Sequence, residues 1–253
     1  MRKAGAVVAI GNGLAANLAA LVGLLATFTV TGGLGGAAWA VGLACGLLVG
    51  AAVVRGLAWG GAEALGPADL VTLVRVVLTC GMAALVAESF VRESVRPTVV
   101  ALAVAALLLD AVDGPVARWT RSSSVFGARF DGEADAFLLL VLSAYVALSF
   151  GVWVLLIGVL RYAFAVAGWV LPWLQEQLPH RYWRKVVTAI EGVVLTIAAA
   201  EVAPQALTYL ALVVALALLA ESFGRDVLWL WLHRFGESVD VTGTPAAFRL
   251  RPP

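Results

Sequence analysis

The sequence contains few charged residues, and this limits the class of protein to which it can belong. Only 13% of its 253 residues are Asp, Glu, Lys or Arg, whereas 62% are hydrophobic. Soluble domains typically carry about 25% charged residues, so a water-soluble globular fold is excluded. Apolar runs long enough to cross a bilayer recur along the whole chain. The composition predicts an all-α, polytopic membrane protein.

Cysteine and histidine are also scarce, with two of each. Cys45 and Cys80 lie in apolar runs and are interpreted as small buried residues, not as a disulfide framework or a metal site. His180 and His233 are assigned no catalytic role. The net charge of +1 comes without a basic patch interleaved with aromatic residues, so no nucleic acid partner is expected.

Eight membrane spans are predicted from the apolar runs. Residues 55–68 are expected to form an interfacial stretch and residues 114–130 a polar turn. We divide the chain into two N-terminal helices with a linker (1–66), a six-helix domain (67–235) and a tail (236–253). The spans cover residues 5–30, 37–54, 69–88, 98–112, 131–150, 152–174, 185–202 and 205–223.

Lysine and arginine are distributed unevenly between the predicted loops. With a cytoplasmic N-terminus, Arg92 and Arg96 are the only basic residues in outer loops, while Arg75 and Arg161 lie within spans. The remaining thirteen of the 17 basic residues lie on the cytoplasmic side. This bias predicts a plasma-membrane protein with both termini in the cytoplasm.

Four aspartates at the junction of the fourth and fifth spans carry the strongest chemical signal. Asp110 and Asp113 are three residues apart, and Asp131 and Asp135 are four apart, so each pair shares one face of a helix. In an antiparallel hairpin all four can point into one cavity, where they repel one another unless cations neutralise them. Hard oxygen ligands favour Mg²⁺ or Mn²⁺. Aspartates that only cap helix ends need no such fixed spacing.

The complete pattern is Asp-x2-Asp-Gly-x2-Ala-Arg-x8-Gly-x3-Asp-x3-Asp, and it resembles the signature of the CDP-alcohol phosphotransferase family at every specified position. The resemblance extends over about residues 67–232. It implies a six-helix bundle that dimerises in the membrane, here preceded by two extra helices expected to pack or anchor. The implied reaction moves a substituted phosphate from a CDP-linked donor, such as CDP-diacylglycerol, to an alcohol and releases CMP in phospholipid biosynthesis.

The resemblance also implies roles for the motif residues. Asp110, Asp113 and Asp131 are expected to bind two Mg²⁺ or Mn²⁺ ions, and Asp135 to act as general base while also touching a metal. Glycines allow close approach of the nucleotide, and an arginine offers a bidentate donor to phosphate. The residues expected at the donor are Asp69, Thr72, Gly114, Ala117, Arg118, Ser124 and Gly127.

Arg75, Arg161 and Lys185 are assigned to the acceptor. The segments around Arg75 and Lys185 are similar to those of phosphatidylglycerophosphate synthase-like members, which favours glycerol 3-phosphate. Arg75 could instead snorkel to the interface, and Lys185 could be an ordinary flanking residue.

Arg161 lies well inside its span and therefore needs an anionic partner. The aspartates are the expected partners, and an ion pair with Glu191 or Glu201 is the alternative.

Two other classes of protein also use acidic residues in membranes. An intramembrane prenyltransferase binds diphosphates through magnesium, but its acidic residues usually form clustered motifs on two separated helices. A cation transporter would place acids near the midplane, in broken helices of inverted repeats, and no repeat is visible.

Overall fold

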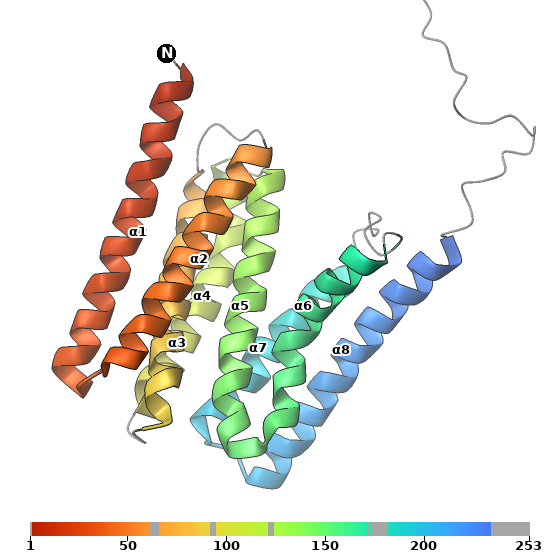
Figure 1. The fold of residues 1–253 in the computed structure, drawn as a ribbon. Helices are drawn as coiled ribbons and strands as arrows, with labels where there is room; N and C mark the ends of the chain where they lie inside the picture. Colours follow the sequence, from red (N-terminus) through yellow and green to blue (C-terminus); the bar gives the residue numbers. More distant parts are fainter. Residues whose placement is uncertain are drawn as a thin grey trace, which may run out of the picture.

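The chain folds into α-helices that lie side by side (Figure 1). The computed structural model describes residues 2–60, 66–91, 95–120, 124–171, 173 and 182–233. No strand occurs in these ranges, which confirms the all-α prediction. The helices are α1 (Arg2–Gly32), α2 (Gly36–Gly60), α3 (Pro67–Ser89), α4 (Arg96–Trp119), α5 (Val125–Phe150), α6 (Leu155–Val170), α7 (Tyr182–Ala200) and α8 (Gln205–His233), with a 3₁₀ turn η2 (Val152–Val154) before α6.

Six of these helices are long and apolar enough to cross a membrane, namely α1 to α5 and α8. A shorter apolar segment covers Val152–Gly168. The α7 helix has 19 residues and carries Arg184, Lys185 and Glu191. Its apolar and polar residues are separated onto different faces more strongly than in the other described helices. The chain is therefore an integral membrane protein.

The connection between α4 and α5 is shorter than the sequence indicated. The predicted polar turn at 114–130 is wrong, because α4 continues to Trp119 and α5 begins at Val125. Pro115 does not end α4, although proline removes one helical hydrogen bond. Ser124 caps α5 by accepting a hydrogen bond from the Gly127 amide at 2.8 Å. The predicted interfacial stretch at 55–68 is also partly helical, since α2 runs to Gly60.

The α3 helix lies at the centre of the packing and is buried along most of its length. Both α1 and α2 cover it, and α4 and α5 pack on it as well. The Asn17 amide of α1 donates to the Leu73 carbonyl at 3.0 Å. At the other end of α3, Glu88 accepts a hydrogen bond from the Gly35 amide, 2.8 Å away, at the start of α2. These two contacts hold the N-terminal helices against α3.

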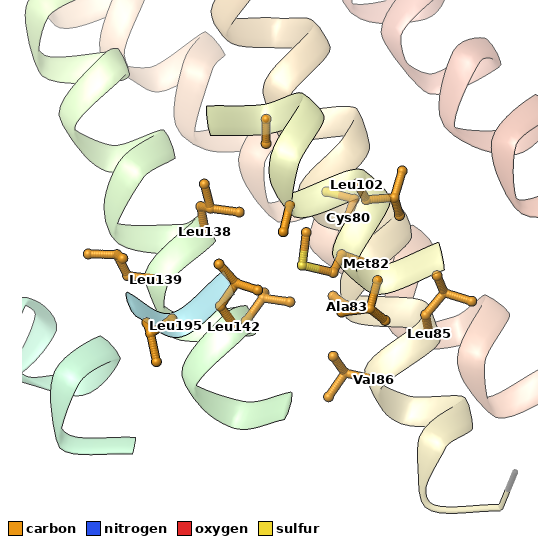
Figure 2. Close-up of a cluster of buried hydrophobic side chains, with 14 of the residues drawn as sticks. Cys80, Met82, Ala83, Leu85, Val86, Leu102, Leu138, Leu139, Leu142 and Leu195 are labelled. Carbon is orange, nitrogen blue, oxygen red and sulfur yellow. The ribbon is translucent and has the colours of Figure 1, made fainter. Parts of the chain in front are cut away.

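The hydrophobic core contains buried side chains of α3, α4, α5 and α7 (Figure 2), and it extends to residues of α1, α2 and α8. Cys80 and Met82 of α3 lie close to Leu138 and Leu142 of α5, and Leu195 of α7 approaches from below. Cys80 is fully buried, as the sequence predicted, whereas Cys45 is only half-buried. This core fixes α4 and α5 relative to α3, and those helices carry the aspartates.

Candidate active site

Three of the four motif aspartates come together in the structure. Asp110 comes from α4, and Asp131 and Asp135 come from consecutive turns of α5. Each offers a carboxylate oxygen, and these oxygens lie within 4.8 Å of one another. All three side chains are half-buried. The backbone of Asp113 belongs to α4, but its side chain lies outside the described part of the structure.

Arg75 of α3 occupies the centre of this group. Its Nη2 atom lies 2.9 Å from Asp110 Oδ1, and its Nη1 atom donates to Asp131 Oδ1 at 2.6 Å. Nη2 also pairs with Asp135 Oδ1. The side chain is only 2% exposed, so it does not snorkel to the interface. A buried guanidinium is tolerated here because the carboxylates compensate its charge.

These ion pairs join residues that are far apart in the sequence. Arg75 is 56 residues from Asp131 and 60 from Asp135. The assignment of Arg75 to the acceptor remains a prediction, because the contacts described above are with the aspartates.

Two predicted donor-site residues lie together at the start of α3 and α5. Asp69 is buried and accepts a hydrogen bond from the Gly66 amide at 2.7 Å, which satisfies the N-cap amide of α3. Gly127 lies directly against it, since a Cβ at this position would fall 2.6 Å from Asp69 Oδ1. The close approach expected of this glycine is therefore to a carboxylate of the same chain. Thr72 is buried one turn after Asp69 and donates to the Ala68 carbonyl at 3.3 Å.

The other donor-site candidates lie on the last turns of α4 or at the start of α5. Gly114 is half-buried on α4, and Ser124 is exposed at the cap of α5. Ala117 and Arg118 also belong to α4, but their side chains are outside the described residues.

Arg161 contacts none of the three aspartates whose side chains are described, Asp110, Asp131 and Asp135, so the expected pairing with these three is wrong. Its Nη2 atom lies 3.1 Å from Glu133 Oε1, between α6 and α5. Arg161 is 47% exposed and Glu133 is 62% exposed. The alternative partners are not used either: Glu201 pairs with Arg96 at 2.8 Å, and Glu191 is buried elsewhere on α7. Sequence reasoning missed Glu133 because it lies among the aspartates of the motif and carries no pattern of its own.

Lys185 is exposed near the start of α7 and lies close enough to Asp110 to interact electrostatically. Thr188, one turn later, donates to the Arg184 carbonyl at 3.0 Å. Glu191 follows on α7 with 1% exposure, and its Oε1 atom has no hydrogen-bond partner in the described part of the chain. The basic end of α7 therefore borders the carboxylate group.

A groove of about 260 Å³ lies elsewhere, between α1 and α2. It is lined by apolar residues and by Asn17, whose amide is engaged with Leu73. It offers no charged group for phosphate or metal, so the carboxylate group is the better candidate for chemistry.

Comparison with known protein families agrees with this site. A family model described as CDP-alcohol phosphatidyltransferase matches residues 66–219, which include α3 to α7, about the first half of α8 and all four aspartates. This is more than half of the chain, and the protein belongs to that family. Members are transferases of substituted phosphate groups. No curated protein and no solved structure matched the chain.

The observed donor set fits a divalent cation. The family is typically dependent on divalent metals, and three carboxylate oxygens converge within 4.8 Å. Oxygen ligands of this kind suit magnesium or manganese better than softer metals.

Proposed function

We propose that this protein transfers a phosphatidyl group from CDP-diacylglycerol or a similar CDP-linked donor to an alcohol, with release of CMP. The observation that carries the proposal is the convergence of Asp110, Asp131 and Asp135 inside the segment that matches the family. We assign residues 67–235 as the catalytic domain in the plasma membrane. Its active site is assigned to the cytoplasmic side, because nucleotide substrates are found in the cytoplasm.

The aspartates divide into two roles in this proposal. Asp110, Asp113 and Asp131 would hold the divalent ions, and Asp135 would be a further ligand. The bound ions supply charge neutralisation for the diphosphate and for the departing nucleotide. Asp135 accepts the proton of the acceptor hydroxyl as that oxygen forms its bond to the phosphorus of the donor. The bond between this phosphorus and the CMP oxygen breaks, and CMP leaves.

The surrounding residues position the two substrates. Arg118 and the end of α4 are assigned to the diphosphate, with Gly114 and Ala117 leaving room for the nucleotide. The start of α5, at Ser124 and Gly127, borders the same region. Asp69 and Thr72 support it from α3.

We assign Arg161 and Lys185 to the anionic group of the acceptor. Both are exposed side chains close to the carboxylate-bearing helices: Arg161 pairs with Glu133, and Lys185 lies near enough to Asp110 to interact electrostatically. A phosphorylated polyol such as glycerol 3-phosphate fits two cationic side chains better than an uncharged alcohol does.

A CMP-release assay tests the proposal directly. Purified protein is incubated with CDP-diacylglycerol, Mg²⁺ or Mn²⁺, and a panel of alcohols that includes glycerol 3-phosphate, inositol phosphate and unphosphorylated polyols. We expect CMP to appear only when a divalent ion and a suitable acceptor are both present. Asp131→Asn is the matched inactive control. Failure to release CMP with every acceptor would refute the proposal.

A further inference from the structure

Arg75 contacts the same three carboxylates that are assigned to the divalent ions. Its two terminal nitrogens reach Asp110, Asp131 and Asp135 from a third helix, with N···O distances of 2.9 Å to Asp110 and 2.6 Å to Asp131. Every one of these contacts uses the Oδ1 atom of the aspartate. The guanidinium and a metal ion would therefore share a single set of ligands.

The charges in this group explain why a cation beside the three carboxylates is favourable. Three carboxylates within 4.8 Å repel one another, and the repulsion is strong in partly buried surroundings. Arg75 supplies one positive charge that cannot be lost by deprotonation. That charge stabilises the three carboxylates together, and it also repels any further cation that approaches them.

We propose that Arg75 is a built-in counter-cation, which holds Asp110, Asp131 and Asp135 together and competes with divalent metal for them. This inference rests on the proposed function, because it takes these aspartates as metal ligands. One consequence is that the ions bind weakly to the protein alone. They bind more tightly together with CDP, because the diphosphate contributes oxygen ligands that magnesium commonly uses.

The test is Mn²⁺ binding by calorimetry, together with thermal unfolding, on the purified full chain in detergent. Removing the charge in Arg75→Gln should increase Mn²⁺ affinity by about tenfold or more. Without metal, Arg75→Gln should unfold at a lower temperature than wild type. Added Mn²⁺ should raise the unfolding temperature of this variant by more than it raises that of wild type. Arg75→Lys keeps the charge and should stay close to wild type in Mn²⁺ affinity.

Arg96→Gln is the matched control for loss of an ion-paired arginine. Arg96 pairs with Glu201 and lies 14 residues before Asp110 on α4, about 21 Å along the helix. This variant should bind Mn²⁺ as wild type does.

Each possible outcome of these measurements either supports or overturns the counter-cation role of Arg75. Unchanged or weaker Mn²⁺ binding in Arg75→Gln would overturn the counter-cation role. Failure of this variant to fold even in saturating Mn²⁺ would also overturn it, because a bound divalent ion should replace the lost charge. Recovery of folded variant only in the presence of Mn²⁺ would support the proposal. Absence of binding in all proteins, wild type included, would instead refute the metal site and the proposed function.

Discussion

The contact between Arg161 and Glu133 allows the acceptor role of Arg161 to be separated from a structural one. Two single substitutions break the same ion pair from opposite sides, Arg161→Gln and Glu133→Gln. Only the first removes the guanidinium that is assigned to the acceptor. If Arg161 serves mainly to join α6 to α5, the two variants should behave alike.

The exposure of the pair limits what the ion pair itself can contribute. An exposed pair such as this one, 47% and 62% accessible at 3.1 Å, stabilises a protein by about 0.2–1 kcal/mol. Its loss should change the acceptor KM by about fivefold at most. A charged hydrogen bond to a substrate phosphate contributes about 1.5–3 kcal/mol, which corresponds to about 10–150-fold.

Steady-state kinetics with each substrate varied in turn distinguishes the two roles. We expect Arg161→Gln to raise the acceptor KM by at least tenfold with little change in the donor KM, and Glu133→Gln to leave both nearly unchanged. Arg161→Lys should rescue only partly, because lysine lacks the planar fork. Equal effects of Arg161→Gln and Glu133→Gln on the acceptor KM, or equal losses for donor and acceptor, would refute the assignment.

Three further predictions follow from the site and its support. Asp110→Asn, Asp113→Asn and Asp131→Asn should each lower CMP release by at least about a hundredfold, and near-normal turnover would remove that residue from the metal ligands. Asp135→Asn should keep CDP binding in calorimetry but lose about 10²–10⁴ in kcat, whereas lost CDP binding would make it a metal ligand first. Gly158→Ala should destabilise the protein by about 1–3 kcal/mol in thermal unfolding, because its Cβ would lie 2.5 Å from Leu140 Cα. Gly224→Ala, which meets nothing within 4 Å, is its control, and equal stability of the two would contradict the packing of α5 on α6.

The grouping of the aspartates could be predicted from sequence because it depends on local geometry. Spacings of three and four place each pair on one helical face, and an antiparallel hairpin of two consecutive spans brings the pairs to the same end of the helices. Those two facts bring Asp110 toward Asp131 and Asp135 without any knowledge of the remaining helices.

The ends of α4 and α5 were harder to predict, because signals for a turn and for a helix overlap there. Pro115 and the polar residues after it favour a turn, yet α4 continues for another turn. Ser124 marks the start of α5 as an N-cap, and this signal was available but was interpreted only as a nucleotide contact. The cap at Ser124 decided where α5 begins.

The partners of the two intramembrane arginines depend on how distant helices face one another. Arg161 was expected to need a carboxylate, since a buried unpaired guanidinium is costly, whereas Arg75 was assigned to the acceptor with snorkelling to the interface as the alternative. Which carboxylate each one meets is set by the rotation of α3 and α6 against α5, and no local spacing encodes that rotation. Arg75 consequently meets the aspartates, and Arg161 meets Glu133.

The N-terminal helices affect the site through α3. Their expected role was packing or anchoring, and α1 and α2 do cover α3. The hydrogen bond from Asn17 ends on Leu73, two residues before Arg75, and Glu88 is tied to Gly35 at the far end of the same helix. A shift or rotation of α3 would move the guanidinium out of reach of carboxylates held by α4 and α5. The two extra helices therefore support the charge balance of the site, although none of its residues lies within them.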